Sequence, residues 1–357
     1  MGYSERLEII RDIEQRRGSQ VICYLTSIRQ GVPGQMAEDA VREIFDHLLA
    51  FNGTPIEQLD LFICSNGGDG VIPWRLVPVF RQFAKSFAVL VPYHAYSAAT
   101  ILALGANEIV MHPFGVLGPI DPTVTNEFNP QIPPGRLVGI SVEDVKAYIS
   151  FVKETVGITH EDELVQMVSL LAQQVHPLAL GNVERFIAQS RMIARKLLNT
   201  HMDNVSDRDI EDIVESLASR LYFHGHPINR TEAERELRLN IAKDVPPEVE
   251  TAMWKLYEDY EAGFKNREAF QPWIDLASQA QPWSVPAGNP PVTTPEMVQQ
   301  THEIPLTIIE STSMSSVQSV KKRFTSIVQF GQKDLHREET LETGWKRLPA
   351  PEPPQAA

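Results

Sequence analysis

The stretch Leu59-Asp-Leu-Phe-Ile-Cys-Ser-Asn-Gly-Gly68 is an apolar run, typical of a buried strand, that ends in a double glycine. A second stretch, Leu90-Val-Pro-Tyr-His-Ala-Tyr-Ser-Ala-Ala99, continues directly into the apolar residues 100–106. A double glycine allows backbone N–H groups to approach a ligand, and a serine between small residues at the start of a helix can present its hydroxyl. Together the two stretches predict an acyl-transfer site with a nucleophile and an oxyanion hole.

Strands and helices alternate around these two stretches. Hydrophobic periodicity predicts strands over 21–26, 59–64, 87–91 and 108–111, and helices over 4–17, 36–51, 71–83 and 97–105. This alternation predicts an α/β domain with a mostly parallel sheet. Ligands collect at the carboxyl ends of the strands in such sheets, and both the double glycine and Ser97 fall at such ends.

The remainder of the chain divides by composition. Residues 115–134 are rich in Gly, Pro and Asn and cannot form a regular helix. Helical patterns then follow one another to residue 264, with an N-cap at Ser206 and a capping box at Thr231-x-x-Glu234. Residues 271–296 hold six prolines and indicate a linker or arm. Residues 306–309 could form one more strand. The Pro- and Ala-rich end, 348–357, is expected to be disordered.

These patterns predict three regions. Residues 1–140 form the α/β core that carries the nucleophile and the oxyanion turn. Residues 141–265 are a helical part that completes the core and supplies oligomer contacts. Residues 266–357 are a Pro-rich arm and a partly disordered tail.

Composition limits the partners and the compartment. The chain has 357 residues, 43% of them apolar, and a net charge of −14, which argues against a nucleic-acid partner. The short basic run Lys321-Lys322-Arg323 is expected to be a solvated turn. Cys23 and Cys64 lie in apolar runs, so we expect buried free thiols in a reducing compartment. With neither a signal peptide nor a membrane span visible, we expect a cytoplasmic protein.

Each half of the predicted site also has a simpler explanation. Ser97 could be only the N-cap of the following helix, and Gly67-Gly68 only a tight turn. If the two stretches instead form an active site, Ser97 is its nucleophile, and the N–H groups of Gly67, Gly68 and Ala98 stabilise the oxyanion.

The base that activates Ser97 is left open by the residues alone. The candidates are His94, His112, His176, Asp121, Lys146 and Lys153. Lys146 flanks an apolar stripe of its predicted helix, so partial burial could lower its pKa and make it a base. No metal site is predicted, because His224-Gly-His226 lacks further ligands, and no cofactor motif occurs.

With these residues the chain resembles the Clp-protease/crotonase superfamily. More closely it resembles the serine dehydrogenase proteinase family, which is related to signal peptide peptidase A and the NfeD-type membrane proteases. The matching segments are residues 62–68, with Asn66 in place of the proline of an Asn-Ser-Pro-Gly-Gly turn, and residues 93–99, 106–120, 175–181 and 223–233. The resemblance covers residues 5–262 and implies a ββα spiral core with a helical C-terminal half.

The resemblance implies a serine peptidase that acts on peptides or proteins and forms a homo-oligomer. Clp proteases place a catalytic histidine about where Ile120-Asp121 falls here, and this chain lacks it. Relatives that also lack the histidine use a lysine from a following helix, and we expect Lys146 in that role, with Lys153 as the other candidate. Nothing in the sequence supports nicotinamide or pyridoxal phosphate chemistry, despite the word dehydrogenase in the family name.

Two other functions compete with the peptidase hypothesis. The missing histidine is consistent with a catalytically inactive oligomeric scaffold or peptide-binding protein. A crotonase-type acyl-CoA enzyme would share the oxyanion hole, but it normally needs an acidic base and a CoA pocket. Peptide binding without turnover would favour the scaffold, and tight binding of a CoA thioester would favour the acyl-CoA enzyme.

Overall fold

The computed structural model describes residues 2–51, 53, 55–120, 123–124, 127–132, 136–220, 225–279, 296–328 and 335–350. The predicted residues Asp121 and His224 lie outside these ranges, as do 280–295 of the Pro-rich region and 351–357 of the expected disordered end. The side chain of Lys146 is also outside what the structure describes.

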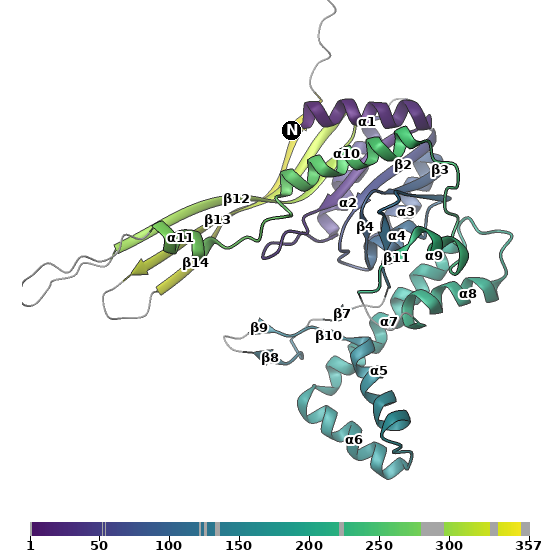
Figure 1. Cartoon of the computed structure of the whole chain (residues 1–357), viewed down its shortest axis with the longest axis vertical. Coiled ribbons are helices and arrows are strands. Elements are labelled where there is room, and N and C mark those ends of the chain that lie inside the picture. The colour runs from purple at the N-terminus through teal and green to yellow at the C-terminus, as the bar shows by residue number, and fades with distance from the viewer. Residues whose placement is uncertain are drawn as a thin grey trace, which may run out of the picture.

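A mixed sheet forms the centre of the molecule (Figure 1). Over the described residues it has seven strands in the order β14-β13-β12-β1-β2-β3-β5. The parallel part comprises β1 (Gln20–Thr26), β2 (Ile56–Cys64), β3 (Ala84–Val91) and β5 (Glu108–Met111). Leu25 is level with Cys64 in the β1–β2 pair, so the carboxyl ends of these two strands meet at one edge of the sheet. The predicted α/β class is confirmed.

Both faces of the parallel strands are buried. Ile22, Leu61 and Val89 face a core cluster shared with α2 (Glu38–Ala50), α3 (Ile72–Phe83) and α4 (Ala98–Ala103). Val21 and Phe62 face a second cluster shared with α1 (Tyr3–Arg17) and α10 (Pro247–Phe264). Because helices cover both faces, the strands read as continuous apolar runs rather than alternating ones. Figure 1 shows α1 and α10 side by side over one face of the sheet.

A small second sheet carries the segment that leads to Ser97. Its order is β11-β6-β4, formed by β11 (Ile228–Asn229), β6 (Val116–Leu117) and β4 (His94–Ala95). The Gly- and Pro-rich region therefore contributes short strands and no described helix, as its composition predicts. Two further pairs of residues there form β7 (Thr123–Val124) and β8 (Gln131–Ile132), and β8 pairs with β9 (Arg136–Leu137) just after the region.

The region after residue 140 is mainly helical. After β10 (Ile140–Ser141), its elements are α5 (Val142–Ser150), η1 (Phe151–Thr155), α6 (Glu161–Gln174), α7 (Pro177–Leu198), α8 (Asp207–Glu215), η2 (Ser216–Arg220) and α9 (Arg230–Arg235). In Figure 1, α5 and α6 project away from the sheet, while α7 connects them to the core. None of the residues of α6 is buried.

Two capping predictions have different outcomes. Ser206 caps α8 as predicted, because its Oγ accepts the N–H of Asp209 at 3.2 Å. The predicted capping box at Thr231 is wrong. The N-cap of α9 is Asn229, whose side-chain oxygen accepts the N–H groups of Thr231 and Glu232 at 3.0 and 3.1 Å. An Asn two residues earlier satisfies the free N–H groups of the first turn equally well.

The C-terminal region contains more strand than its sequence predicts. After α11 (Pro272–Gln279), the strands β12 (Glu296–Glu310), β13 (Met314–Val328) and β14 (Leu335–Pro349) each span 15 residues. They extend the central sheet, because β12 pairs antiparallel with β1. Figure 1 shows them projecting as an arm on which α11 lies.

The arm corrects two local predictions. Lys321-Lys322-Arg323 lies inside β13 rather than in a solvated turn, and Lys322 and Arg323 form ion pairs with Glu338 and Glu339 of β14. The expected short strand over 306–309 is the end of a much longer one. Polar residues occupy both faces over much of the arm, so the sequence lacks the apolar alternation that would identify these strands.

Candidate active site

Ser97 occupies a strained turn between β4 and α4. Its backbone has φ 52° and ψ −117°, whereas Lys265 at the end of α10 has the ordinary left-handed values of 57° and 42°. A residue holds such a conformation only where the surrounding structure imposes it. Nucleophilic serines are found on strained strand-to-helix turns of this kind, which expose the hydroxyl at the edge of a sheet.

The Ser97 side chain is half-buried and does not cap α4. Among the residues that the structure describes, none forms a hydrogen bond with its Oγ. The interpretation of Ser97 as a simple N-cap therefore loses its physical basis, because a capping serine must accept an N–H from the first turn. The hydroxyl remains available to a ligand.

Gly67 lies directly against the Ser97 turn. A Cβ at position 67 would be 2.7 Å from the Tyr96 carbonyl oxygen, 2.9 Å from Ser97 Cβ and 3.0 Å from the Ala98 nitrogen. Its φ of 95° is also one that residues with side chains rarely adopt. The structure thus brings together the two halves of the predicted site, although they are about 30 residues apart in sequence.

Ser65 connects the two halves by hydrogen bonds. Its N–H donates to the His94 carbonyl at 3.1 Å, and its carbonyl accepts the Tyr96 N–H at 2.9 Å. Its Oγ accepts the Gly67 N–H at 3.0 Å and lies 2.7 Å from Thr26 Oγ1. Ser65 and Thr26 were not among the predicted site residues. A Ser-x-Gly turn after a strand is a signal that could have identified Ser65.

The predicted oxyanion donors differ in their hydrogen bonding. The Gly67 N–H is occupied by Ser65, as described above. The N–H groups of Gly68 and Ala98, by contrast, have no acceptor within the described part of the chain. Gly68 is exposed, with its turn held by the Asp69 N–H on the Met36 carbonyl at 2.9 Å. The Ala98 N–H follows Ser97 directly, and the Gly68 N–H belongs to the turn whose Gly67 packs on Ser97. Free N–H groups of this kind can bind the oxygen of an attacked carbonyl.

His94 is the described histidine nearest to Ser97 in sequence. The His94 ring is buried and stacks on Tyr96 with centroids 4.6 Å apart, and its Nε2 has no partner among the described residues. Burial lowers the pKa of His94 to about 4, so its imidazole is neutral at pH 7. His94 therefore packs behind the Ser97 turn, three residues away along the chain.

The other described base candidates are engaged elsewhere or exposed. His112 accepts the Phe114 N–H at 3.1 Å through Nδ1 and stacks on Trp254 of α10, beside an open cavity of about 520 Å³. His176 caps α7 through its Nδ1, which accepts the Leu178 N–H at 3.2 Å. Lys153 is exposed on η1. None of these three side chains has a described hydrogen bond to Ser97, so none of them is assigned as its base.

Lys146 lies on α5, which packs on α7 and β10. α4 also packs on α7, so the two helices share a neighbour. The position of the Lys146 amine and that of the whole of Asp121 are outside what the structure describes. The assignment of the base stays a prediction.

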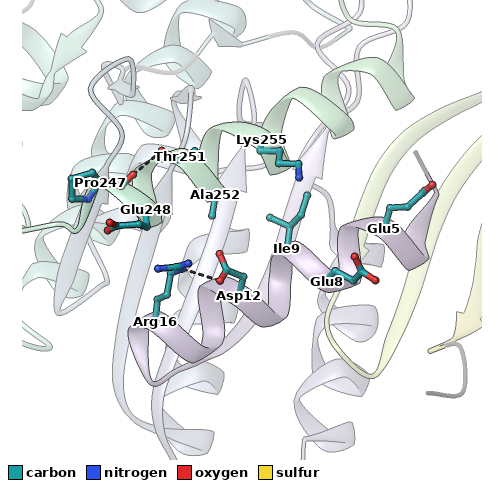
Figure 2. Close-up of a pocket in the computed structure, with 10 residues that line it drawn as sticks. All are labelled: Glu5, Glu8, Ile9, Asp12, Arg16, Pro247, Glu248, Thr251, Ala252 and Lys255. Carbon is teal, nitrogen blue, oxygen red and sulfur yellow. Dashed lines mark hydrogen bonds and ion pairs between the residues drawn. The ribbon is translucent and has the colours of Figure 1, made fainter. Parts of the chain in front are cut away.

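A separate groove of about 690 Å³ runs between α1 and α10 (Figure 2). Charged side chains rim it, and Arg16 pairs with Asp12 at 2.8 Å within it. The two helices cover the face of the sheet opposite α4, so this groove is not part of the Ser97 site.

Two properties of the described residues bear on metals and membranes. They contain no cluster of three or more His, Cys, Asp or Glu side chains that could hold a metal ion. No helix in these ranges combines the length and the apolar character needed to cross a membrane.

Comparison with protein families finds a match to the N-terminal part of the chain. Residues 2–134 match the ClpP-like SDH-type serine proteinases. The match includes Gly67, Gly68, Ser97 and Ala98, and it ends before Lys146. The resemblance predicted from the sequence is confirmed over these residues.

Two curated proteins of Methanocaldococcus jannaschii, both uncharacterized, align with much of the chain. MJ0137 is 26% identical over 258 residues, covering 71% of this chain and 78% of its own. MJ1495 is 24% identical over 250 residues, covering 69% of this chain and 74% of its own. Neither relative has an assigned activity to compare.

Two solved structures similar to part of this chain superpose with low TM-scores. A serine-to-alanine variant of the 1510-N membrane-bound stomatin-specific protease is 15% identical, covers 59% of this chain and 77% of its own, and superposes with a TM-score of 0.36. The ClpP protease catalytic domain from Plasmodium falciparum is 10% identical, covers 69% of this chain and 94% of its own, and gives 0.35.

Proposed function

We propose that this chain, whose residues 2–134 match the ClpP-like SDH-type serine proteinases, is a serine peptidase with Ser97 as its nucleophile. The observation that carries the proposal is the packing of Gly67 against Ser97, whose hydroxyl has no hydrogen bond among the described residues. Each of the two turns that meet there keeps one N–H without a described acceptor, that of Gly68 and that of Ala98. Acyl transfer requires this combination of a nucleophile and preorganised donors.

Gly68 and Ala98 are the oxyanion donors in this proposal. Gly67 was also predicted from the sequence to be a donor, but its N–H is held by Ser65. We therefore give Gly67 a packing role, because its lack of a side chain lets the turn approach Ser97.

Lys146 is the proposed general base. Its neutral amine accepts the proton of the Ser97 hydroxyl as Oγ attacks the peptide carbonyl carbon, and it returns that proton to the leaving nitrogen as the C–N bond breaks. Water then hydrolyses the acyl-enzyme ester and frees Ser97. A lysine can accept this proton near neutral pH only if its surroundings lower its pKa.

A fluorophosphonate probe tests the nucleophile. We expect the purified full-length protein to become labelled, and Ser97→Ala to abolish both labelling and peptide hydrolysis. Labelling that persists in Ser97→Ala, or that never occurs in the folded wild-type protein, contradicts the proposal.

Paired lysine variants test the base. Lys146→Ala should lower kcat by about a hundredfold or more, the range expected for loss of a general base. Lys153→Ala is the matched control, because Lys153 is exposed on the adjoining element η1. This variant should stay within about twofold of wild type, as expected for a surface substitution. The same loss in both variants, or in neither, would count against Lys146.

A catalytically inactive peptide-binding protein is the second candidate. It is favoured by the absence of any described side chain hydrogen-bonded to Ser97. Equal affinity for peptides in wild type and Ser97→Ala, with no turnover in either, would support it. Isothermal titration with a peptide pool, followed by mass spectrometry of the recovered peptides, separates it from the peptidase.

We also propose a homo-oligomer in a reducing compartment, with the cytoplasm as the expected location. The exposed apolar side chains of α6, including Val165 and Val168, support a subunit contact in the helical part. The thiols of Cys23 and Cys64 are free and buried, which is consistent with a reducing environment.

A further inference from the structure

Two buried hydroxyl groups meet beneath the turn that carries Gly67 and Gly68. Thr26 ends β1, and Ser65 follows β2, where the register makes them neighbours. Their oxygens are 2.7 Å apart, and the residues are only 2% and 1% exposed. A polar pair in such a position is held away from water, so the Thr26 hydroxyl relies on that of Ser65 for its hydrogen bond among the described residues.

The Ser65 hydroxyl determines the direction of one peptide group. Its Oγ accepts the N–H of Gly67 at 3.0 Å and so turns that N–H inward, toward the buried Ser65 and Thr26 hydroxyls. The next N–H along the chain, that of Gly68, has no acceptor among the described residues, and Gly68 is exposed. The hydroxyl therefore selects which of two successive N–H groups faces outward.

The backbone of Ser65 fixes the turn relative to the nucleophile. Its N–H and carbonyl bond to the His94 carbonyl and the Tyr96 N–H, on either side of Ala95. Ser97 follows Tyr96 directly. One residue therefore joins the double-glycine turn to the serine turn through three hydrogen bonds.

The geometry points to Ser65, supported by Thr26, as a positioning residue that aims the Gly68 N–H at the oxyanion formed when Ser97 attacks a peptide carbonyl. This inference rests on the proposed peptidase function. Ser65 does not touch the substrate, so its effect is confined to the transition state, where the oxygen gains charge. Loss of the Ser65 hydroxyl should lower kcat with little change in KM.

Three variants of the full-length protein test the inference. Ser65→Ala removes the acceptor of the Gly67 N–H, and kcat should fall by about ten- to a hundredfold, less than the loss of a donor itself. Thr26→Val keeps the shape but removes the supporting hydroxyl, and Thr26→Ser keeps the hydroxyl. We expect Thr26→Val to lower kcat by about tenfold and Thr26→Ser to stay near wild type.

Binding measurements distinguish positioning from a general structural effect. A peptide aldehyde, which forms a tetrahedral adduct with a serine, should bind Ser65→Ala more weakly in the same proportion as kcat falls. A product peptide without the aldehyde should bind with unchanged affinity. The buried hydroxyl of Ser315, which donates to Glu310 at 2.7 Å, provides the control. Ser315→Ala should lower the melting temperature without changing kcat.

Several outcomes would overturn the inference. The first is that folded Ser65→Ala keeps an unchanged kcat. The second is that Ser65→Ala loses affinity for the aldehyde and for the product peptide to the same extent. The third is that Thr26→Ser lowers kcat as much as Thr26→Val does. The failure of the proposed function is recognised separately, because then the wild-type protein itself neither hydrolyses peptides nor reacts at Ser97.

Discussion

Position 67 has no room for a side chain. A methyl group there would lie 2.9 Å from Ser97 Cβ and 2.7 Å from the Tyr96 carbonyl oxygen, closer than non-bonded atoms approach. The backbone of Gly67 and that of Ser97 both have positive φ, so strain is concentrated where the two halves of the site meet. Such strain at a small group of residues is typical of a functional site.

Under the proposed peptidase function, Gly67→Ala should therefore abolish most of the peptide hydrolysis. The added methyl must push the serine turn away, and we expect kcat/KM to fall by about a hundredfold or more, as when catalytic geometry shifts by about an ångström. Gly18→Ala is the matched control, because Gly18 also has positive φ, 61°, but no atom lies within 4 Å of the place that its added methyl group would take. Peptide hydrolysis measures the effect. An active Gly67→Ala protein would show that the two turns do not need this close contact.

The residues proposed for the site carry local sequence signals, whereas the residues that support them do not all do so. Gly67, Gly68 and Ser97 were recognisable because glycine pairs and small residues around a serine are local patterns. Thr26 was not recognisable, because its contact with Ser65 exists only once β1 and β2 pair in register. Ser65 belongs to a local turn, yet its bonds to His94 and Tyr96 depend on the second sheet.

At the scale of elements, α2 is attached to the arm through a buried histidine. His47 is fully buried, with its Nδ1 2.8 Å from Ser311 Oγ and its Nε2 3.3 Å from Ser316 Oγ. Burial lowers the pKa of His47 from 6.5 to about 4, although Glu43 and Glu310 act in the opposite direction. The folded protein therefore keeps this imidazole neutral at a pH where the unfolded chain protonates it.

Acid should weaken the protein through His47. Because the folded pKa is the lower one, the contribution to stability is complete above pH 6.5 and is lost as the pH falls toward about 4. We expect the free energy of unfolding of wild type to fall over this range by up to roughly 3 kcal/mol more than that of His47→Gln. Urea denaturation at several pH values measures it. His160→Gln, at an exposed position, should follow the wild-type curve, and an equally steep curve for His47→Gln would exclude this role.

On the scale of the whole molecule, a buried ion network joins three distant parts of the chain. Arg6 of α1 contacts Glu310 of β12 at 2.7 Å and Asp259 of α10 at 2.8 Å. The Tyr260 hydroxyl donates to Glu310 at 2.6 Å, and burial raises the pKa of Tyr260 well above its usual value. Because each charge is both paired and hydrogen-bonded, removing one partner leaves another uncompensated.

Glu310→Ala should destabilise the whole fold. Breaking a buried ion pair costs about 3 kcal/mol or more, since Arg6 keeps its charge in the interior. Asp12→Ala removes the exposed partner of Arg16 and should leave the unfolding midpoint nearly unchanged. Thermal and urea unfolding measure both variants. A small effect of Glu310→Ala would mean that water or Asp259 replaces the lost carboxylate.

The oligomer proposal also belongs to the scale of the whole molecule. Val165 and Val168 of α6 are 63% and 51% exposed, although a helix usually buries its apolar side chains. If they form a subunit contact, Val165→Ser with Val168→Ser should lower the mass measured by sedimentation equilibrium. Leu49→Ser, at a residue of α2 that is 57% exposed, is the control. A wild-type monomer would contradict the proposal.

Local chemistry in the sequence determined the parallel strands, the helices between them and the two turns of the site. These features follow from apolar runs, glycine pairs and helical periodicity, which need no knowledge of distant residues. Tertiary structure alone decided the long arm, the Arg6–Glu310 network and the support of Ser65 by Thr26. These depend on pairing between segments remote in sequence, and polar residues that become buried carry no local sign of the partner that satisfies them.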